Sequence, residues 1–307
     1  MGHSTTTRRF PVNDLNETKY KVLNWSHRFG TFCFLDNHQY QIEPHNMECL
    51  LAAGTRRVLR TDAGSALQQL QEFHAKSNSP QGKSPRGRGW LFGHLGYDLK
   101  NEIEHLSSSH PDPIGFADLF FFEPEVVIRL QEKEMWIDAD DPEAIYQAII
   151  ATDDTINKKD SSPVHIHNSI PREEYISIIR QLQQHILRGD CYEINFCQEF
   201  FAENSVIDPI AVYRKLSDVS PNPFSALYRN DDRWLICASP ERFLQKKGTR
   251  ILSQPIKGTA RRITNNATED REIRDALQQS KKDRSENVMV VDLVRNDLSR
   301  ICEEGTV

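Results

Sequence analysis

Short apolar runs separated by polar turn residues recur along the first half of the chain. Such runs predict β-strands, because a strand needs only about four to eight residues and commonly ends at Gly, Pro, Asn or Asp. The runs lie at residues 31–35, 50–59 with an interruption at Gly54, 90–99, 116–128 and 135–137. Residues 21–25 suit either a short helix or a strand, whereas 63–75 carry Leu67, Leu70 and Phe73 at helical spacing. The first half is therefore predicted to be rich in β-sheet.

The second half mixes helices with hairpins. A helix is predicted between Ser169, its possible N-cap, and Gly189, which would end it. Residues 191–200 alternate in polarity as a strand does. Two hairpins are predicted after them, because each pair of apolar runs is joined by turn residues. These hairpins span 220–239, with its turn at 230–232, and 243–254, with its turn at 246–248.

Two further helices are predicted near the end of the sequence. Residues 269–279 carry alternating charges, as a solvated helix does. Residues 283–301 form a second helix that is apolar on nearly every side between Val288 and Val294. A helix that is apolar all round is normally buried, so we expect this one to lie in the interior.

The best domain boundary lies in the polar stretch 152–170, which contains a Lys-Lys-Asp-Ser-Ser-Pro run. It separates an N-terminal β-rich domain, 1–155, from a second domain, 165–307. Together the patterns predict an α+β fold of large β-sheets with packed helices.

Composition excludes several classes of protein. The formal charge of −6 over 307 residues, without a long basic run, argues against nucleic acids and anionic membranes as partners. The six cysteines form no CxxC pair, which favours a reducing compartment. No apolar run is long enough to span a membrane, and the first sixteen residues lack the apolar core of a signal peptide. These features are typical of a cytoplasmic enzyme.

The candidate chemistry lies between Ser239 and Ala260. Here Ser-Pro-Glu-Arg-Phe precedes the predicted hairpin 243–254, and Pro-Ile-Lys-Gly-Thr follows it. Because a hairpin returns both of its ends to one edge, we expect Glu241 and Lys257 to come together.

A nucleophilic lysine must be unprotonated, and lowering its pKa from ~10.4 to about 7 costs roughly 5 kcal/mol. Burial can supply that shift. Gly258 would let a ligand approach the backbone, and Thr259 offers a hydroxyl and an N–H to an anion. An isolated lysine at a strand end usually points into water, so the neighbouring residues are what make Lys257 a candidate.

These two clusters, together with Asp-Arg-Ser-Glu-Asn-Val-Met-Val-Val-Asp-Leu-Val-Arg-Asn-Asp-Leu at 283–298, resemble the chorismate-utilising enzymes. Within that family the pattern is most similar to the aminodeoxychorismate synthase component I branch. Lys257 is the discriminating residue, since the anthranilate synthase branch carries alanine there. Isochorismate-forming members carry a lysine where this chain has Glu193, so the resemblance favours ammonia over water as the nucleophile.

The resemblance implies that chorismate and ammonia are converted to 4-amino-4-deoxychorismate, for para-aminobenzoate and folate synthesis. Lys257 would add to C2 of chorismate, and Glu241 would act as general acid and then as base. Gly258 and Thr259 would bind the substrate carboxylate. A separate glutaminase subunit would supply the ammonia.

The resemblance also implies that Glu286 binds Mg²⁺, which would hold the substrate carboxylate. Hard oxygen ligands suit this cation. The local sequence alone instead favours a first-turn glutamate stabilised by the helix dipole, and it is the resemblance that favours a magnesium ligand.

Two alternatives stay open. The chain could be anthranilate synthase component I, against which Lys257 argues, or an inactive fragment that serves as a glutaminase-binding module. In the resembled family a further stretch follows the position of Val307 and carries more substrate and Mg²⁺ ligands. We therefore expect the chorismate-binding domain to be C-terminally truncated here, with part of its hydrophobic core uncovered.

Overall fold

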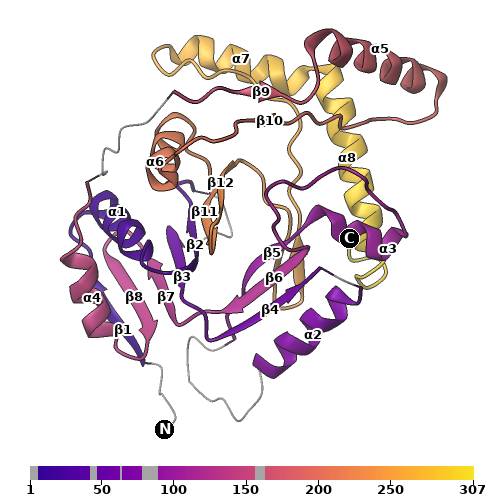
Figure 1. Cartoon of the computed structure of the whole chain (residues 1–307). Coiled ribbons are helices and arrows are strands. Elements are labelled where there is room, and N and C mark those ends of the chain that lie inside the picture. The colour runs from indigo at the N-terminus through magenta and orange to yellow at the C-terminus, as the bar shows by residue number, and fades with distance from the viewer. Residues whose placement is uncertain (1–5, 42–46, 63, 78–88, 156–162) are drawn as a thin grey trace. The chain divides into compact units, whose positions relative to one another are not determined.

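The computed structural model describes residues 6–41, 47–62, 64–77, 89–155 and 163–307. It divides the chain into two compact units (Figure 1). One comprises Met1–Asp154 with Tyr213–Val307, and the other comprises Thr155–Val212. The second unit thus begins in the predicted linker, of which residues 156–162 lie outside the described residues. The seven-stranded sheet contains strands from both predicted domains, 1–155 and 165–307. The assignment of a catalytic domain to 165–307 stays a prediction.

A seven-stranded antiparallel sheet forms the centre of the first unit. In spatial order its strands are β1 (Thr6–Pro11), β8 (Glu134–Ala139), β7 (Val126–Leu130), β3 (Cys49–Ala53), β2 (Thr31–Asp36), β11 (Phe224–Asn230) and β12 (Arg233–Ser239). The predicted hairpin of 220–239 is confirmed as β11 and β12. Strand β11 adds to the sheet beside β2, where Leu227 faces Phe34 across the ladder. The end of β12 therefore carries Ser239 and the chain that follows it to the edge of this sheet.

A three-stranded sheet packs on the first one. It consists of β4 (Arg57–Thr61), β6 (Leu119–Glu123) and β5 (Phe92–Leu95). The predicted interruption of the 50–59 strand is confirmed, because Gly54, with a φ of +71°, divides it into β3 and β4, which lie in different sheets. The core between the sheets consists of Cys33, Ala52, Phe92, Ala117, Phe120, Phe122, Val127 and Tyr228.

Helices cover both sheets. Helix α1 (Leu15–Ser26) contacts α4 (Pro142–Ile150), and α2 (Ala66–Ser77) contacts β4 and β6. A short 3-10 turn leads from β5 into α3 (Lys100–Glu104). Helix α1 is fixed by an ion cluster, in which the buried Lys19 ammonium lies 2.7 Å from Asp36 Oδ1 and also contacts the Glu48 carboxylate.

The second unit contains α5 (Arg172–Arg188), the short strands β9 (His167–Asn168) and β10 (Phe200–Phe201), and the beginning of α6 (Pro209–Val219). Gly189 ends α5 with a φ of +84°, as predicted. The N-cap prediction was wrong. Pro171 occupies that position, and the Ser169 hydroxyl instead accepts a hydrogen bond from Glu199 N–H.

The predicted strand at 191–200 was also wrong over most of its length. Residues 191–199 adopt no strand, and among the described residues of this unit only Phe200–Phe201 pairs with β9. Alternating polarity specifies two faces, but a strand also needs a neighbouring strand to hydrogen-bond. Glu193 therefore does not lie in a β-strand.

The C-terminal elements are β13 (Gln245–Lys247), β14 (Arg250–Leu252), α7 (Ala267–Gln279) and α8 (Lys281–Ser299), which confirm the predicted hairpin and helices. The predicted burial of the last helix was wrong: Val288 is 67% exposed and Leu293 is 60% exposed. Apolar residues on every side favour burial only where other elements pack around the helix, and α8 contacts α7 on one side. None of the helices in the described part of the chain is both long and apolar enough to cross a membrane.

Candidate active site

The hairpin β13–β14 brings the two candidate clusters together. The Ser253 hydroxyl donates a hydrogen bond to the carbonyl of Phe243 over 3.1 Å, which closes the base of the hairpin. Beyond it, the Ile256 N–H donates to Glu241 Oε1 over 3.1 Å. The Glu241 carboxylate is thus hydrogen-bonded to the backbone of the residue before Lys257, which brings the two clusters together as the hairpin pattern predicted.

The position of Glu241 is fixed from its own side of the hairpin too. The Ser239 hydroxyl accepts a hydrogen bond from Glu241 N–H over 3.2 Å and donates one to the Glu241 carbonyl over 3.0 Å. The next residue, Arg242, is buried and lies over the Phe224 ring at 5.1 Å. Arg242 therefore supports the local fold, while the Glu241 side chain stays exposed.

Lys257 lines an open pocket of about 900 Å³ between the loop after β14 and the corner where α7 meets α8. We call it the Lys257 pocket. Its lining residues are Pro255, Ile256, Lys257, Asp275, Leu277, Gln278, Gln279, Asp283, Arg284 and Asn287. The Lys257 side chain is half-buried, so it is only partly removed from water. Most of the lining is polar, which suits a polar or charged ligand.

Gly258 is held tightly against α8. Its φ of +79° is a conformation that favours glycine, and a side-chain carbon there would lie 2.9 Å from the Asp283 side chain. The Ser280 hydroxyl in turn caps α8 by accepting a hydrogen bond from Asp283 N–H over 3.3 Å. Thr259, the next residue of the loop, is exposed. The loop that carries Lys257 is thus docked on the first turn of α8.

Glu286, the predicted magnesium ligand, lies one turn further along α8 and is half-buried. Its carboxylate lies 3.6 Å from the ammonium of Lys282. Nowhere among the described residues do three His, Cys, Asp or Glu side chains gather into a cluster that could enclose a metal ion. Mg²⁺ usually takes only one or two protein carboxylates together with water and substrate oxygens, so Glu286 alone is compatible with it, and magnesium at Glu286 stays a prediction from the sequence.

The comparison with family models decides the class of protein. The model of the chorismate binding enzymes matches residues 31–307 of this chain. The chain belongs to the chorismate-binding enzyme family.

The names of the curated relatives fall into two groups, aminodeoxychorismate synthases and anthranilate synthases. The aminodeoxychorismate synthase component 1 of Klebsiella aerogenes is 35% identical over 227 residues, which cover 71% of this chain and 49% of that protein. The anthranilate synthase component I-like protein of a Synechocystis strain is 34% identical over 227 residues, covering 71% of this chain and 46% of that protein. The chain spans about half the length of the curated relatives it matches.

Solved structures confirm the predicted α+β fold of the family. Anthranilate synthase component I from Streptococcus pneumoniae superimposes with a TM-score of 0.66 at 24% identity, covering 85% of this chain and 63% of that one. The menaquinone-specific isochorismate synthase of Escherichia coli superimposes with a TM-score of 0.60 at 14% identity, covering 94% of this chain and 63% of that one.

The structure adds residues that the sequence prediction had not assigned to the site. Asp283, Arg284 and Asn287 line the Lys257 pocket, although only Glu286 had been selected from this helix. Asp283 and Asn287 are four residues apart and thus share one face of α8. Helical spacing from Asp283 is the signal that could have found Asn287.

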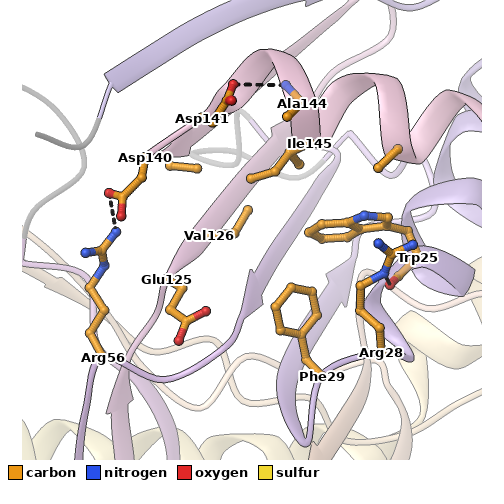
Figure 2. A pocket seen from close by; sticks show the side chains of 12 residues that line it. Trp25, Arg28, Phe29, Arg56, Glu125, Val126, Asp140, Asp141, Ala144 and Ile145 are labelled. Atoms are coloured by element: carbon orange, nitrogen blue, oxygen red, sulfur yellow. Dashed lines mark hydrogen bonds and ion pairs between the residues drawn. The ribbon is translucent and has the colours of Figure 1, made fainter. Parts of the chain in front are cut away.

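A second pocket, of about 530 Å³, lies between the end of α1 and the start of α4 (Figure 2). Four of the charged side chains that line it contact neighbouring residues: Arg28, Arg56, Asp140 and Asp141. Arg56 lies 2.6 Å from Asp140, Asp141 caps α4 by accepting the Ala144 N–H, and Arg28 lies over the Trp25 ring at 5.3 Å. These contacts hold the connection from β8 to α4 in place.

Proposed function

We propose that this chain aminates chorismate to 4-amino-4-deoxychorismate, the reaction that the names of its aminodeoxychorismate synthase relatives indicate. The observation that supports the proposal is the arrangement of Glu241 and Lys257. The Glu241 carboxylate accepts the N–H of the residue before Lys257, and Lys257 lines a polar pocket. A carboxylate beside a nucleophilic amine is the pair that general acid–base and covalent catalysis require.

In the proposed reaction the Lys257 amine adds to C2 of chorismate. Both ring double bonds shift by one position, from C1=C2 and C5=C6 to C1=C6 and C4=C5, and the C4 hydroxyl leaves as water after taking a proton from Glu241. Ammonia then attacks C4, the double bonds shift back, and the bond between Lys257 and C2 breaks. Glu241 receives the proton that the incoming ammonia releases. The amide of Ile256 orients one oxygen of this carboxylate through both steps.

The docked loop explains the proposed roles of the two residues after Lys257. Because Gly258 has no side chain, the backbone can lie against Asp283, a residue that lines the pocket. Thr259 follows with a hydroxyl that can donate to a carboxylate. We propose that both bind the substrate carboxylate.

Two further components belong to the proposal. Ammonia would come from a glutaminase subunit, in keeping with the word "component" in the names of the relatives. Magnesium would bind at Glu286, but no step above depends on it.

The decisive experiment is intact-mass analysis after incubation with chorismate and Mg²⁺ in the absence of ammonia. The expected product is the protein plus chorismate minus one water, and Lys257→Ala should show no such adduct. The absence of an adduct on the wild-type protein, under conditions that support turnover with ammonium, would remove the covalent step.

Anthranilate synthesis is the second candidate, favoured by the 34% identity to an anthranilate synthase component I-like protein. Product analysis separates the two reactions. Anthranilate is fluorescent and forms directly from chorismate and ammonium, whereas aminodeoxychorismate yields para-aminobenzoate only after a lyase is added. Fluorescence without lyase would replace the first proposal by the second.

A further inference from the structure

Four ionisable side chains line the Lys257 pocket, and one of them is a cation that could bind an anion. They are Lys257, Asp275, Asp283 and Arg284. Asp275 is already paired with Arg274, whose guanidinium lies 2.8 Å from it. Asp283 is packed against Gly258.

The following inference rests on the proposed function. A nucleophilic Lys257 must be neutral when it reacts, so it cannot at that moment balance the charge of a substrate with two carboxylates. Of the described residues that line the pocket, Arg284 is then the remaining cation. Arginine keeps its charge at every accessible pH, which makes it suited to this task.

The surroundings of Arg284 support this assignment. It lies in the first turn of α8, immediately after Asp283, and its side chain is exposed. Its backbone N–H donates to the Ser280 carbonyl over 3.0 Å. The guanidinium itself has no hydrogen bond or ion pair to a described residue. By contrast, Arg262 is paired with Asp270 and Arg295 with Asp292, each at 2.8 Å.

We propose that Arg284 is a substrate-binding residue that holds a carboxylate of the substrate in the Lys257 pocket. The planar guanidinium can donate two parallel hydrogen bonds to one carboxylate, which fixes its orientation as well as its charge. Because the neighbouring Asp283 contacts Gly258, this carboxylate would be held next to the loop that carries the amine.

The test compares Arg284→Gln and Arg284→Lys with a matched control in the whole protein. Arg271→Gln, on the exposed surface of α7 and outside the pocket lining, removes the same charge. Chorismate binding is measured by equilibrium dialysis, and kcat and KM are measured with ammonium as the nitrogen source. Thermal unfolding shows whether each variant is folded.

Arg284→Gln should weaken chorismate binding and raise KM by roughly 10- to 100-fold, the loss expected for one charge-assisted hydrogen bond. We expect kcat to change by less than about threefold, because the lysine and the glutamate are intact. Arg284→Lys should lie between the wild type and Arg284→Gln, since lysine keeps the charge but not the planar fork. Arg271→Gln should match the wild type.

The outcomes separate this inference from the proposed function. If the wild type is active and both Arg284 variants bind chorismate as it does, only the role of Arg284 is overturned. If the wild type makes no aminated product but Arg284→Gln still weakens chorismate binding, the reaction is wrong and the binding residue stands. A wild-type protein that binds no chorismate overturns both. Should Arg284→Gln unfold, Arg284→Lys alone decides the question.

Discussion

The seven-stranded sheet and the C-terminal segment 240–307 differ in how far their apolar and charged side chains are buried. In the sheet, Phe34, Leu51 and Leu227 are almost fully buried, and the ammonium of Lys19, on the covering helix α1, is enclosed by two carboxylates. In the segment, neither α7 nor α8 has a buried residue, and the ion pairs lie at the surface.

This difference in burial indicates that the residues that stabilise the fold are not the residues that position the candidate site. Buried apolar area contributes most of the free energy of folding, and it lies in the sheet, beside which the enclosed charges must stay paired. The candidate site is instead positioned by a few local contacts, such as Ile256 N–H to Glu241 and Gly258 against Asp283. Substitutions in the two regions should therefore affect different measurements.

The largest expected effect concerns activity alone. Lys257→Ala should lower the rate of chorismate amination by on the order of 10³-fold or more, because it removes the proposed nucleophile. The unfolding free energy should stay within ~1 kcal/mol of the wild type, since the side chain is only half-buried. Steady-state kinetics and chemical denaturation measure the two quantities.

Two controls sharpen this prediction. Lys246→Ala removes an exposed lysine of β13 and should change neither quantity. Lys257→Arg keeps the positive charge but cannot supply a neutral amine, so it should be as inactive as Lys257→Ala. Activity in Lys257→Arg would contradict the nucleophilic role and leave only an electrostatic one.

The second effect concerns stability alone. Lys19→Met leaves the carboxylates of Asp36 and Glu48 without their cation, and breaking a buried pair in this way costs about 3–5 kcal/mol. Lys21→Met, on the same helix, breaks only a partly exposed pair with Glu17 and should cost less than about 1 kcal/mol. Equal losses in the two variants would show that the enclosed cluster is not what fixes α1.

The same cluster predicts a pH dependence. Burial pulls the pKa of Lys19 down, but the charge and hydrogen bonds of Asp36 and Glu48 outweigh burial and raise it above its ordinary value of 10.5. A raised folded-state pKa contributes stability that is fully present below pH 10.5 and is lost as the pH rises through the folded-state value. The stability difference between wild type and Lys19→Met should therefore shrink only above pH 10.5.

The third effect compares one leucine from each region. Leu51→Ala removes a fully buried side chain from β3 and should destabilise the protein by about 2–5 kcal/mol. Leu293→Ala, at a 60% exposed position of α8, should cost less than about 1 kcal/mol. Denaturant unfolding curves give both values. A large loss for Leu293→Ala would mean that another chain or segment covers α8 in solution.

Apolar periodicity alone could predict the hairpins and most helices. The turn at Asp231, with its positive φ, and the return of both hairpin ends toward Glu241 follow from local residues. The exposure of Val288 and Leu293 on α8 could not be predicted in this way, because it depends on which other elements pack against the helix. For the same reason, periodicity could not predict the pairing of β11 with β2 or the contact between Gly258 and Asp283, because both join residues that are distant in the sequence.

The smallest effect tests how the site is held. Gly258→Ala introduces a carbon 2.9 Å from the Asp283 side chain at a φ of +79°, so the loop must move as well as bear backbone strain. Gly248→Ala is its matched control, because that turn has a φ of +61° but no atom within 4 Å of an added carbon. Both variants should lose about 1 kcal/mol of stability to the backbone conformation. Only Gly258→Ala should also lose activity, by roughly 10-fold, because moving the loop displaces the neighbouring Lys257 from the pocket. Equal activity in the two variants would show that the contact with Asp283 does not position the lysine.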